Sequence, residues 1–158
     1  MNRIDNPNER SNKRILVSGG RVAGFIVAIG LLYSGLIHYQ NQFFFYESVL
    51  RYDLFNPDIA AYASVWITTV SMVIGVALLL PTLRSAASMI SICLFAAFTL
   101  AQISAWLRGV QAGCGCFGIS STQIGLHSIL TAVLFLVLSV YCFWVEAILM
   151  KRRRPNVF

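Results

Sequence analysis

Long apolar runs dominate the pattern of hydrophobic and polar positions along the chain. Four stretches, residues 21–39, 59–80, 86–107 and 124–150, are almost free of charged side chains. Each is close to the roughly 20 residues that an α-helix needs to cross the hydrocarbon core of a bilayer. The runs are continuous rather than alternating, which favours helices over strands. The pattern therefore predicts an all-α, polytopic membrane protein, a bundle of four transmembrane helices.

The composition agrees with this architecture. Hydrophobic residues make up 58% of the 158 residues and charged residues 11%, whereas soluble domains average about 45–50% and about 25%. A soluble domain of this size could not bury so much apolar surface. The same values exclude a disordered chain. The lipid bilayer is therefore the predicted partner of most of the surface.

The basic residues predict the orientation. All of the 12 Lys and Arg except Arg51 and Arg108 lie before or at the start of the first run, between the second and third, or after the fourth. Cytoplasmic segments carry such an excess. We therefore expect basic cytoplasmic tails at 1–20 and 151–158 around a membrane domain at 21–150, with both termini cytoplasmic in the cell (inner) membrane. Anchoring beside anionic lipid explains the net charge of +6, so no nucleic-acid partner is expected.

Small residues recur at helical spacing within the runs and predict where the helices pack. Helices in lipid associate through close approach at small side chains. The predicted seams are Gly20, Gly24 and Ala28; Ala61, Ser64, Thr68, Ser71 and Gly75; and Ala97, Ala101 and Ala105. The aromatic segment 40–58 predicts a further short helix on the membrane surface, where it would cover the outer end of the bundle.

The second outer segment, residues 108–123, carries the candidate chemistry. It contains Cys114 and Cys116 on either side of Gly115. In an extended chain the two Cα atoms would lie about 7 Å apart, and a disulfide needs roughly 4.4–6.8 Å. Gly115 permits the necessary bend, but so small a ring is strained, and strained disulfides are the labile ones. On the oxidising side of the membrane, the pair predicts thiol–disulfide exchange.

Three basic side chains, those of Arg108, His38 and His127, are expected on the same side of the membrane as this loop. A neighbouring cation would lower a thiol pKa and so activate the pair. The alternative is that Arg108 anchors the membrane interface and the histidines close helix ends. Cys93 and Cys142 fall inside the third and fourth runs, where we expect both to be packed as small hydrophobic side chains.

A metal site is the rival use of the cysteine pair. Zinc pairs are usually spaced by two to four residues, and no second pair exists here, so no metal ligand is assigned. Soft thiolates do suit Cu(I). A carrier of Cu(I) or of another small ligand therefore stays an alternative.

The run Ala-Trp-Leu-Arg-Gly at 105–109, followed by Cys-Gly-Cys-Phe-Gly at 114–118, resembles the methylamine-utilisation protein MauE family, which is related to the DoxX-like membrane proteins. The likeness extends over about residues 20–150. It implies a four-helix membrane protein that helps to mature a periplasmic, disulfide-rich partner, such as the small subunit of methylamine dehydrogenase. The matched functional pair would be Cys114 and Cys116, with Arg108 from the same motif. Relatives often carry Pro-x-x-Glu in the second helix, where residues 68–71 here are Thr-Thr-Val-Ser.

Two functions follow as hypotheses. The first is a thiol–disulfide redox protein acting through Cys114 and Cys116, with Arg108 beside them. Its electrons would pass to a membrane quinone or to a periplasmic thioredoxin-like protein. The second is a noncatalytic membrane assembly factor, whose cysteines only shape the loop.

Overall fold

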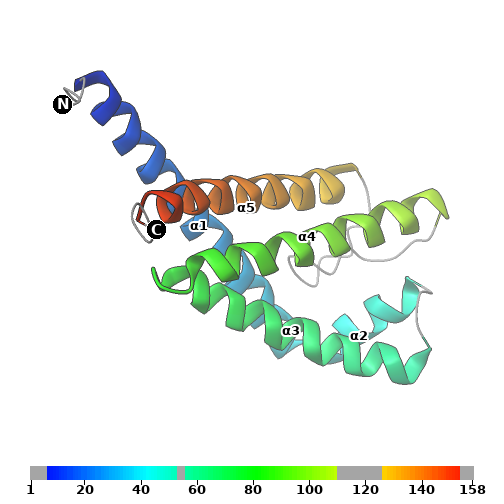
Figure 1. Ribbon diagram of the computed structural model, residues 1–158. Helices are drawn as coiled ribbons and strands as arrows, with labels where there is room; N and C mark the ends of the chain where they lie inside the picture. Colours follow the sequence, from blue (N-terminus) through cyan, green and yellow to red (C-terminus); the bar gives the residue numbers. More distant parts are fainter. Residues whose placement is uncertain (1–6, 53–55, 110–125, 154–158) are drawn as a thin grey trace.

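The computed structural model describes residues 7–52, 56–109 and 126–153 (Figure 1). Every regular element in these ranges is an α-helix. The helices are α1 (Pro7–Gln40), α2 (Gln42–Arg51), α3 (Pro57–Leu79), α4 (Arg84–Leu107) and α5 (Leu126–Arg153).

Four of the helices are long and apolar enough to span a membrane, which confirms the predicted all-α, four-span bundle. The spans are Ile15–Gln40, Pro57–Leu79, Arg84–Leu107 and Leu126–Met150. Only 22–33% of the most apolar stretch of each span is buried inside the bundle. Many of the other apolar side chains, among them Val22, Phe25, Val65 and Leu134, are exposed, which suits a lipid surrounding and not an aqueous one.

Proline explains two helix boundaries. α3 begins at Pro57 after an extended Asn56, and proline suits the first turn of a helix because its missing N–H would be unsatisfied there anyway. α3 ends at Leu79, and Leu80 is extended, with ψ 118°. Leu80 precedes Pro81, whose ring disfavours helical geometry at the residue before it. The chain therefore turns at once into α4.

The helices run antiparallel between two ends of the bundle. α5 ends beside the α3–α4 turn, and the first turns of α1 project beyond the bundle on this same side (Figure 1), which we call the Arg84 end. α2 lies at the opposite end, which we call the α2 end. The register agrees with this arrangement, because Gly20 near the start of the first span lies against Val145 near the end of α5. An even number of crossings thus brings α1's start and α5's end to one side.

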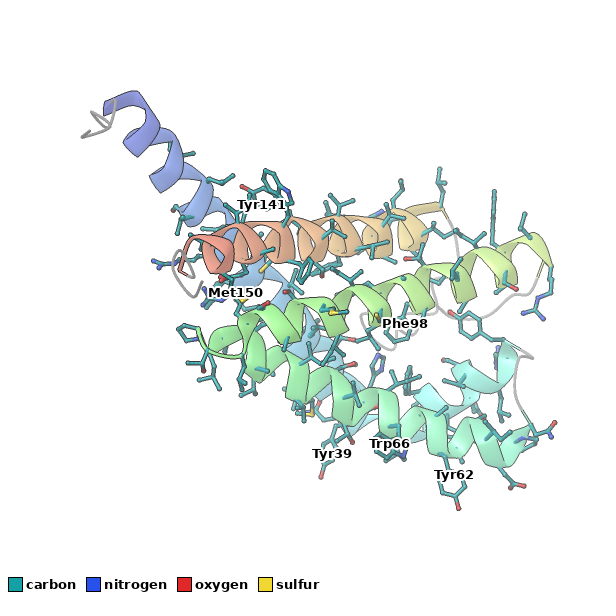
Figure 2. All side chains as sticks on the ribbon, viewed as in Figure 1. Tyr39, Tyr62, Trp66, Phe98, Tyr141 and Met150 are labelled. Atoms are coloured by element: carbon teal, nitrogen blue, oxygen red, sulfur yellow. The ribbon has the colours of Figure 1, made fainter. Side chains whose placement is uncertain are left out.

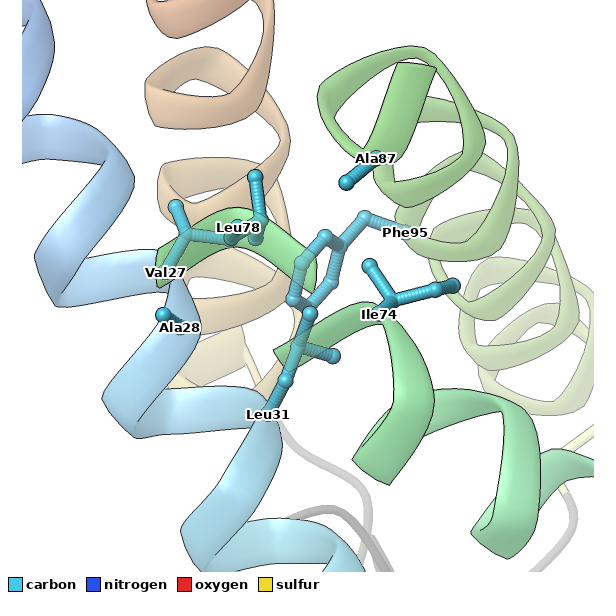
Figure 3. Packing of buried hydrophobic residues seen from close by; sticks show 7 residues of the cluster. All are labelled: Val27, Ala28, Leu31, Ile74, Leu78, Ala87 and Phe95. Atoms are coloured by element: carbon cyan, nitrogen blue, oxygen red, sulfur yellow. The ribbon is translucent and has the colours of Figure 1, made fainter. Parts of the chain in front are cut away.

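The core lies where α1, α3 and α4 meet. It comprises Val27, Ala28, Leu31, Ile74, Leu78, Ala87 and Phe95 (Figure 3). α5 joins it through Phe135, whose ring stacks on Phe95 with centroids 5.4 Å apart. Glycine allows the helices to approach: a Cβ on Gly75 would lie 2.8 Å from Leu32 Cγ and 3.2 Å from the Ala28 carbonyl oxygen.

The predicted seams hold for α1 and for most of α3. Ser64, Thr68 and Ser71 are buried as expected, but Ala61 is exposed and Ala60 takes its place. Each of the three hydroxyls donates to a backbone carbonyl of its own helix. The three hydroxyl donors are therefore used within α3.

The prediction of the packing seam on α4 was wrong in part. Ala105 is buried, but Ala97 is exposed and Ala101 only half-buried. The face of α4 that packs into the bundle instead carries Ser88, Ser91 and Phe95. Alanine spacing alone could not distinguish this face from the one that borders open space.

Candidate functional site

α2 is amphipathic and packs against α3. Phe45 and Val49 are buried in a cluster with Ala60 of α3. Phe43 and Phe44, on the other side of the helix, are 66% and 55% exposed. The short helix predicted from the aromatic segment is therefore present, and its buried face covers the end of the bundle.

His38 lies beneath α2, near the end of α1. Its side chain is buried, with 6% of its surface exposed. Its ring stacks on Phe45 with centroids 3.9 Å apart and an interplanar angle of 23°. No hydrogen bond joins the imidazole to another residue in the described ranges. The packing of α2 therefore holds this ring in place by its face and leaves its nitrogens available.

A cavity of about 510 Å³ extends from His38 into the bundle. Figure 2 shows Phe98 of α4 on the side that faces α2 and α3. The cavity lies among all five helices, and its lining is mostly apolar. The described lining residues are Gly30, Leu31, Ser34, His38, Phe45, Ser48, Val49, Tyr52, Ile67, Ser71, Leu94, Phe95, Ala97, Phe98, Leu100, Ala101, Ser104, Ser128 and Ala132.

The Arg-Gly pair of the motif closes α4 at the α2 end. Gly109 has φ 67°, the left-handed conformation that ends many helices and that glycine adopts at least cost. Its N–H bonds the Trp106 carbonyl, while the Arg108 N–H bonds that of Ser104. The chain beyond α4 therefore leaves the helix at a fixed point.

The Arg108 side chain ties α4 to α2. Nη2 donates to the Tyr52 carbonyl at 2.5 Å, and Nε donates to the Ser104 carbonyl at 3.3 Å. Both acceptors lie at helix C-termini, where the helix dipole favours a cation. Arg108 thus has a structural role in the described part of the chain, whatever it contributes to the loop that follows.

The other candidates from the sequence are scattered. Cys114 and Cys116 lie outside the described residues. His127 is exposed in the first turn of α5 and is not among the residues that line the cavity. Cys142 is buried and packs against Gly24, as expected. The prediction that Cys93 is packed was wrong: it is exposed, because α4 turns the opposite face into the bundle.

One feature at the Arg84 end was missed. Arg84 Nη1 lies 3.4 Å from Glu146 Oε1, with side chains only 14% and 16% exposed. Arg84 Nε also donates to the Leu78 carbonyl at the end of α3. A signal did exist in the sequence, since Glu146 is the one acid in the fourth run and Arg84 the one base between the second and third. The pair joins α4 to α5.

No group of three or more His, Cys, Asp or Glu side chains in the described ranges could hold a metal ion.

These features define a multi-pass membrane protein with a four-span bundle, an end-capping helix and an internal cavity. The family described as methylamine utilisation protein MauE matches residues 16–145, and the chain belongs to this family. No curated protein and no solved structure matches the chain.

Proposed function

We propose that this chain is a thiol–disulfide exchange protein of the cell membrane, acting through Cys114 and Cys116. The observation that carries the proposal is the end of α4, where Gly109 and the Arg108 tie fix the point from which the chain continues. Cys114 follows five residues after Gly109, a chain length that spans at most about 18 Å. The pair is therefore tethered to the α2 end.

In the proposed thiol–disulfide exchange, a disulfide passes from this chain to the partner protein. A thiolate of a reduced partner attacks the Cys114–Cys116 disulfide, a mixed disulfide forms, and one of the two cysteines leaves as a thiolate. The partner's second thiol then attacks the mixed disulfide and releases the other cysteine. The partner gains a disulfide, and the Cys114–Cys116 pair holds two electrons and two protons, which an acceptor must remove.

The partner we propose is an exported, disulfide-rich protein in the periplasm. The basic residues support the periplasmic side for the α2 end, because Arg84 and the described parts of the two tails, residues 7–20 and 151–153, lie at the opposite end. The family description supports a partner in methylamine utilisation, such as a methylamine dehydrogenase-type subunit. A thioredoxin-like protein would serve as an intermediate carrier.

A noncatalytic assembly factor is the second candidate. The Arg108 guanidinium already donates to two backbone carbonyls, which favours a shaping role for the motif. This candidate makes a different prediction, because a Cys114→Ser, Cys116→Ser double variant would still support the partner fully. Under thiol exchange the same variant loses that support.

The redox state and location of the pair test the proposal. A Cys93→Ser, Cys142→Ala background leaves Cys114 and Cys116 as the remaining thiols. Intact cells are treated with a membrane-impermeant maleimide, before and after mild reduction. We expect labelling after reduction and little before it. Labelling only in permeabilised cells would place the pair in the cytoplasm, and full labelling without reduction would show permanently reduced thiols; either result would contradict the proposal.

The control for membrane integrity uses the same background with both loop cysteines replaced by serine. Ser85 lies at the start of α4, at the Arg84 end. In a Ser85→Cys variant of this background, we expect the impermeant reagent to label the protein only after permeabilisation.

A further inference from the structure

The cavity beneath α2 has the size of a ligand site. Small-molecule pockets range over about 300–1,000 Å³, and this one measures about 510 Å³. A dry cavity of roughly 150 Å³ already holds benzene. The cavity is therefore larger than the void that one missing side chain would leave, and it has room for more than a single aromatic ring.

His38 supplies the polar end of the site. A neutral imidazole offers one donor and one acceptor, and buried polar groups nearly always have a partner. His38 is buried to 6% exposure and lines the cavity, yet it bonds no other residue in the described part of the chain. A ligand in the cavity would satisfy it.

The lining also restricts the ligand's charge. The described lining residues include no Asp, Glu, Lys or Arg. An ionised ligand would lose its hydration here without gaining an opposite charge, which is costly. The site therefore suits an uncharged, mostly apolar molecule with a hydrogen-bonding group.

The cavity reaches the outward face of α4. Leu100 lines it and is nevertheless 68% exposed, and Ala97 both lines it and is exposed. A molecule dissolved in lipid could thus pass in beside α4. At the α2 end the lining includes Tyr52 and Ser104, whose carbonyls hold Arg108, next to the point where the chain leaves α4.

We infer that this cavity binds the head group of a membrane quinone, with the His38 N–H donating to a ring carbonyl. A quinone is flat, uncharged and carries two carbonyl acceptors, and its isoprenoid tail can leave beside Leu100. A lipid acyl chain would fill the same space but leave the imidazole without a partner. His38→Phe keeps an aromatic ring to stack on Phe45 and removes the donor.

What the quinone does there rests on the proposed function. The reduced Cys114–Cys116 pair loses two electrons and two protons as its S–S bond forms. The quinone gains both and becomes the quinol, which leaves into the lipid. The bound quinone is thus the acceptor that the exchange cycle requires, in place of a thioredoxin-like protein.

Binding is measured on the purified full-length protein in micelles, by titration with a benzoquinone that carries one isoprene unit. We expect saturable binding that His38→Phe weakens about 3- to 10-fold, the effect of one hydrogen bond, and that His38→Gln partly restores. Ala101→Phe, which fills the cavity, should abolish binding. His127→Phe is the matched control, since that histidine is exposed, and it should leave binding unchanged.

Two results would overturn the inference. One is no saturable quinone binding to the folded wild type. The other is binding that a ten-carbon alcohol matches and that His38→Phe leaves unchanged, which would make the cavity a lipid pocket.

A second measurement separates this inference from the proposed function. The Cys114→Ser, Cys116→Ser variant should bind quinone as the wild type does but form no quinol, whereas the reduced wild type forms one quinol per cysteine pair. If the wild type bound quinone but formed no quinol, electron transfer from the cysteine pair would be refuted, and the inference of a quinone site would stand. If the protein exchanged disulfides in cells but the purified protein bound no quinone, the quinone site would be refuted and the exchange function would stand.

Discussion

The attachment of α2 to the bundle depends on Phe45. This ring is 6% exposed, stacks on His38 and packs with Val49 and Ala60. Truncation of a buried phenylalanine to alanine costs about 3–5 kcal/mol. An undocked α2 would regain some apolar contact with detergent, so for Phe45→Ala we take the lower value, about 3 kcal/mol.

Hydrogen exchange resolved to residues 42–51 measures this cost directly, because local opening sets the exchange rate of each amide. About 1.4 kcal/mol corresponds to a factor of ten. Phe45→Ala should therefore speed exchange in α2 by roughly 10²-fold while leaving the core of α4 unchanged.

Phe44→Ala is the matched control, since Phe44 belongs to the same helix and is 55% exposed. A surface change of this kind is worth within about 0.5 kcal/mol, or roughly a twofold change in rate. Equal rates in the two variants, or an α2 that stays fully protected in Phe45→Ala, would refute the assignment of Phe45 as the residue that holds α2.

Three further predictions concern the rest of the bundle. Gly20→Ala should lower unfolding stability in micelles by about 1–3 kcal/mol, because its Cβ would lie 2.6 Å from Val145 Cγ1. Glu146→Gln should cost about 1–2 kcal/mol in the same assay, less than a fully buried pair, since Arg84 loses its carboxylate but is 14% exposed. Cys93 is exposed on a membrane-spanning helix and should react with a lipid-soluble maleimide faster than the buried Cys142 does.

Each of these three predictions has a control variant at a residue of the same type or in the same helix. Ser18→Ala, on the exposed side of α1, should leave stability unchanged. If it lowered stability as much as Gly20→Ala does, the loss would not come from the contact between α1 and α5. Glu47→Gln should have little effect, and a matching loss would mean that the ion pair contributes nothing specific. Cys142 is buried and should stay unreactive. If both thiols were labelled at the same rate, the faces assigned to α4 or α5 as buried and exposed would be wrong.

The sequence predicted the architecture well because lipid imposes strong requirements. A helix must be long and apolar to cross the bilayer, so run length alone found all four spans. The predicted run 59–80 agrees with α3 to within two residues at each end. The close contact at Gly20 was also visible, since glycine at helical spacing permits it.

Helix rotation was harder to predict. Ala97 and Cys93 are small and apolar, and both a packed face and a lipid-facing one accept such residues. Which face turns inward is decided by packing against the other helices, so Phe95 is buried and Cys93 is not.

The cavity and the position of His38 also depend on long-range packing. α2 must fold back onto α3 before Phe45 can cover the imidazole, and no local pattern encodes that contact. For Arg108 the sequence indicated a special residue but not its partner, the Tyr52 carbonyl on α2.

The most direct test of the central claim is to trap the exchange itself. Cys114→Ser and Cys116→Ser single variants are expressed with the partner pathway, acid-quenched and separated without reduction. Thiol exchange predicts that one single variant accumulates a covalent complex with an exported protein, which disappears on reduction and in the double variant. If neither variant forms such a complex and the double variant supports partner maturation as the wild type does, the cysteines have no exchange function.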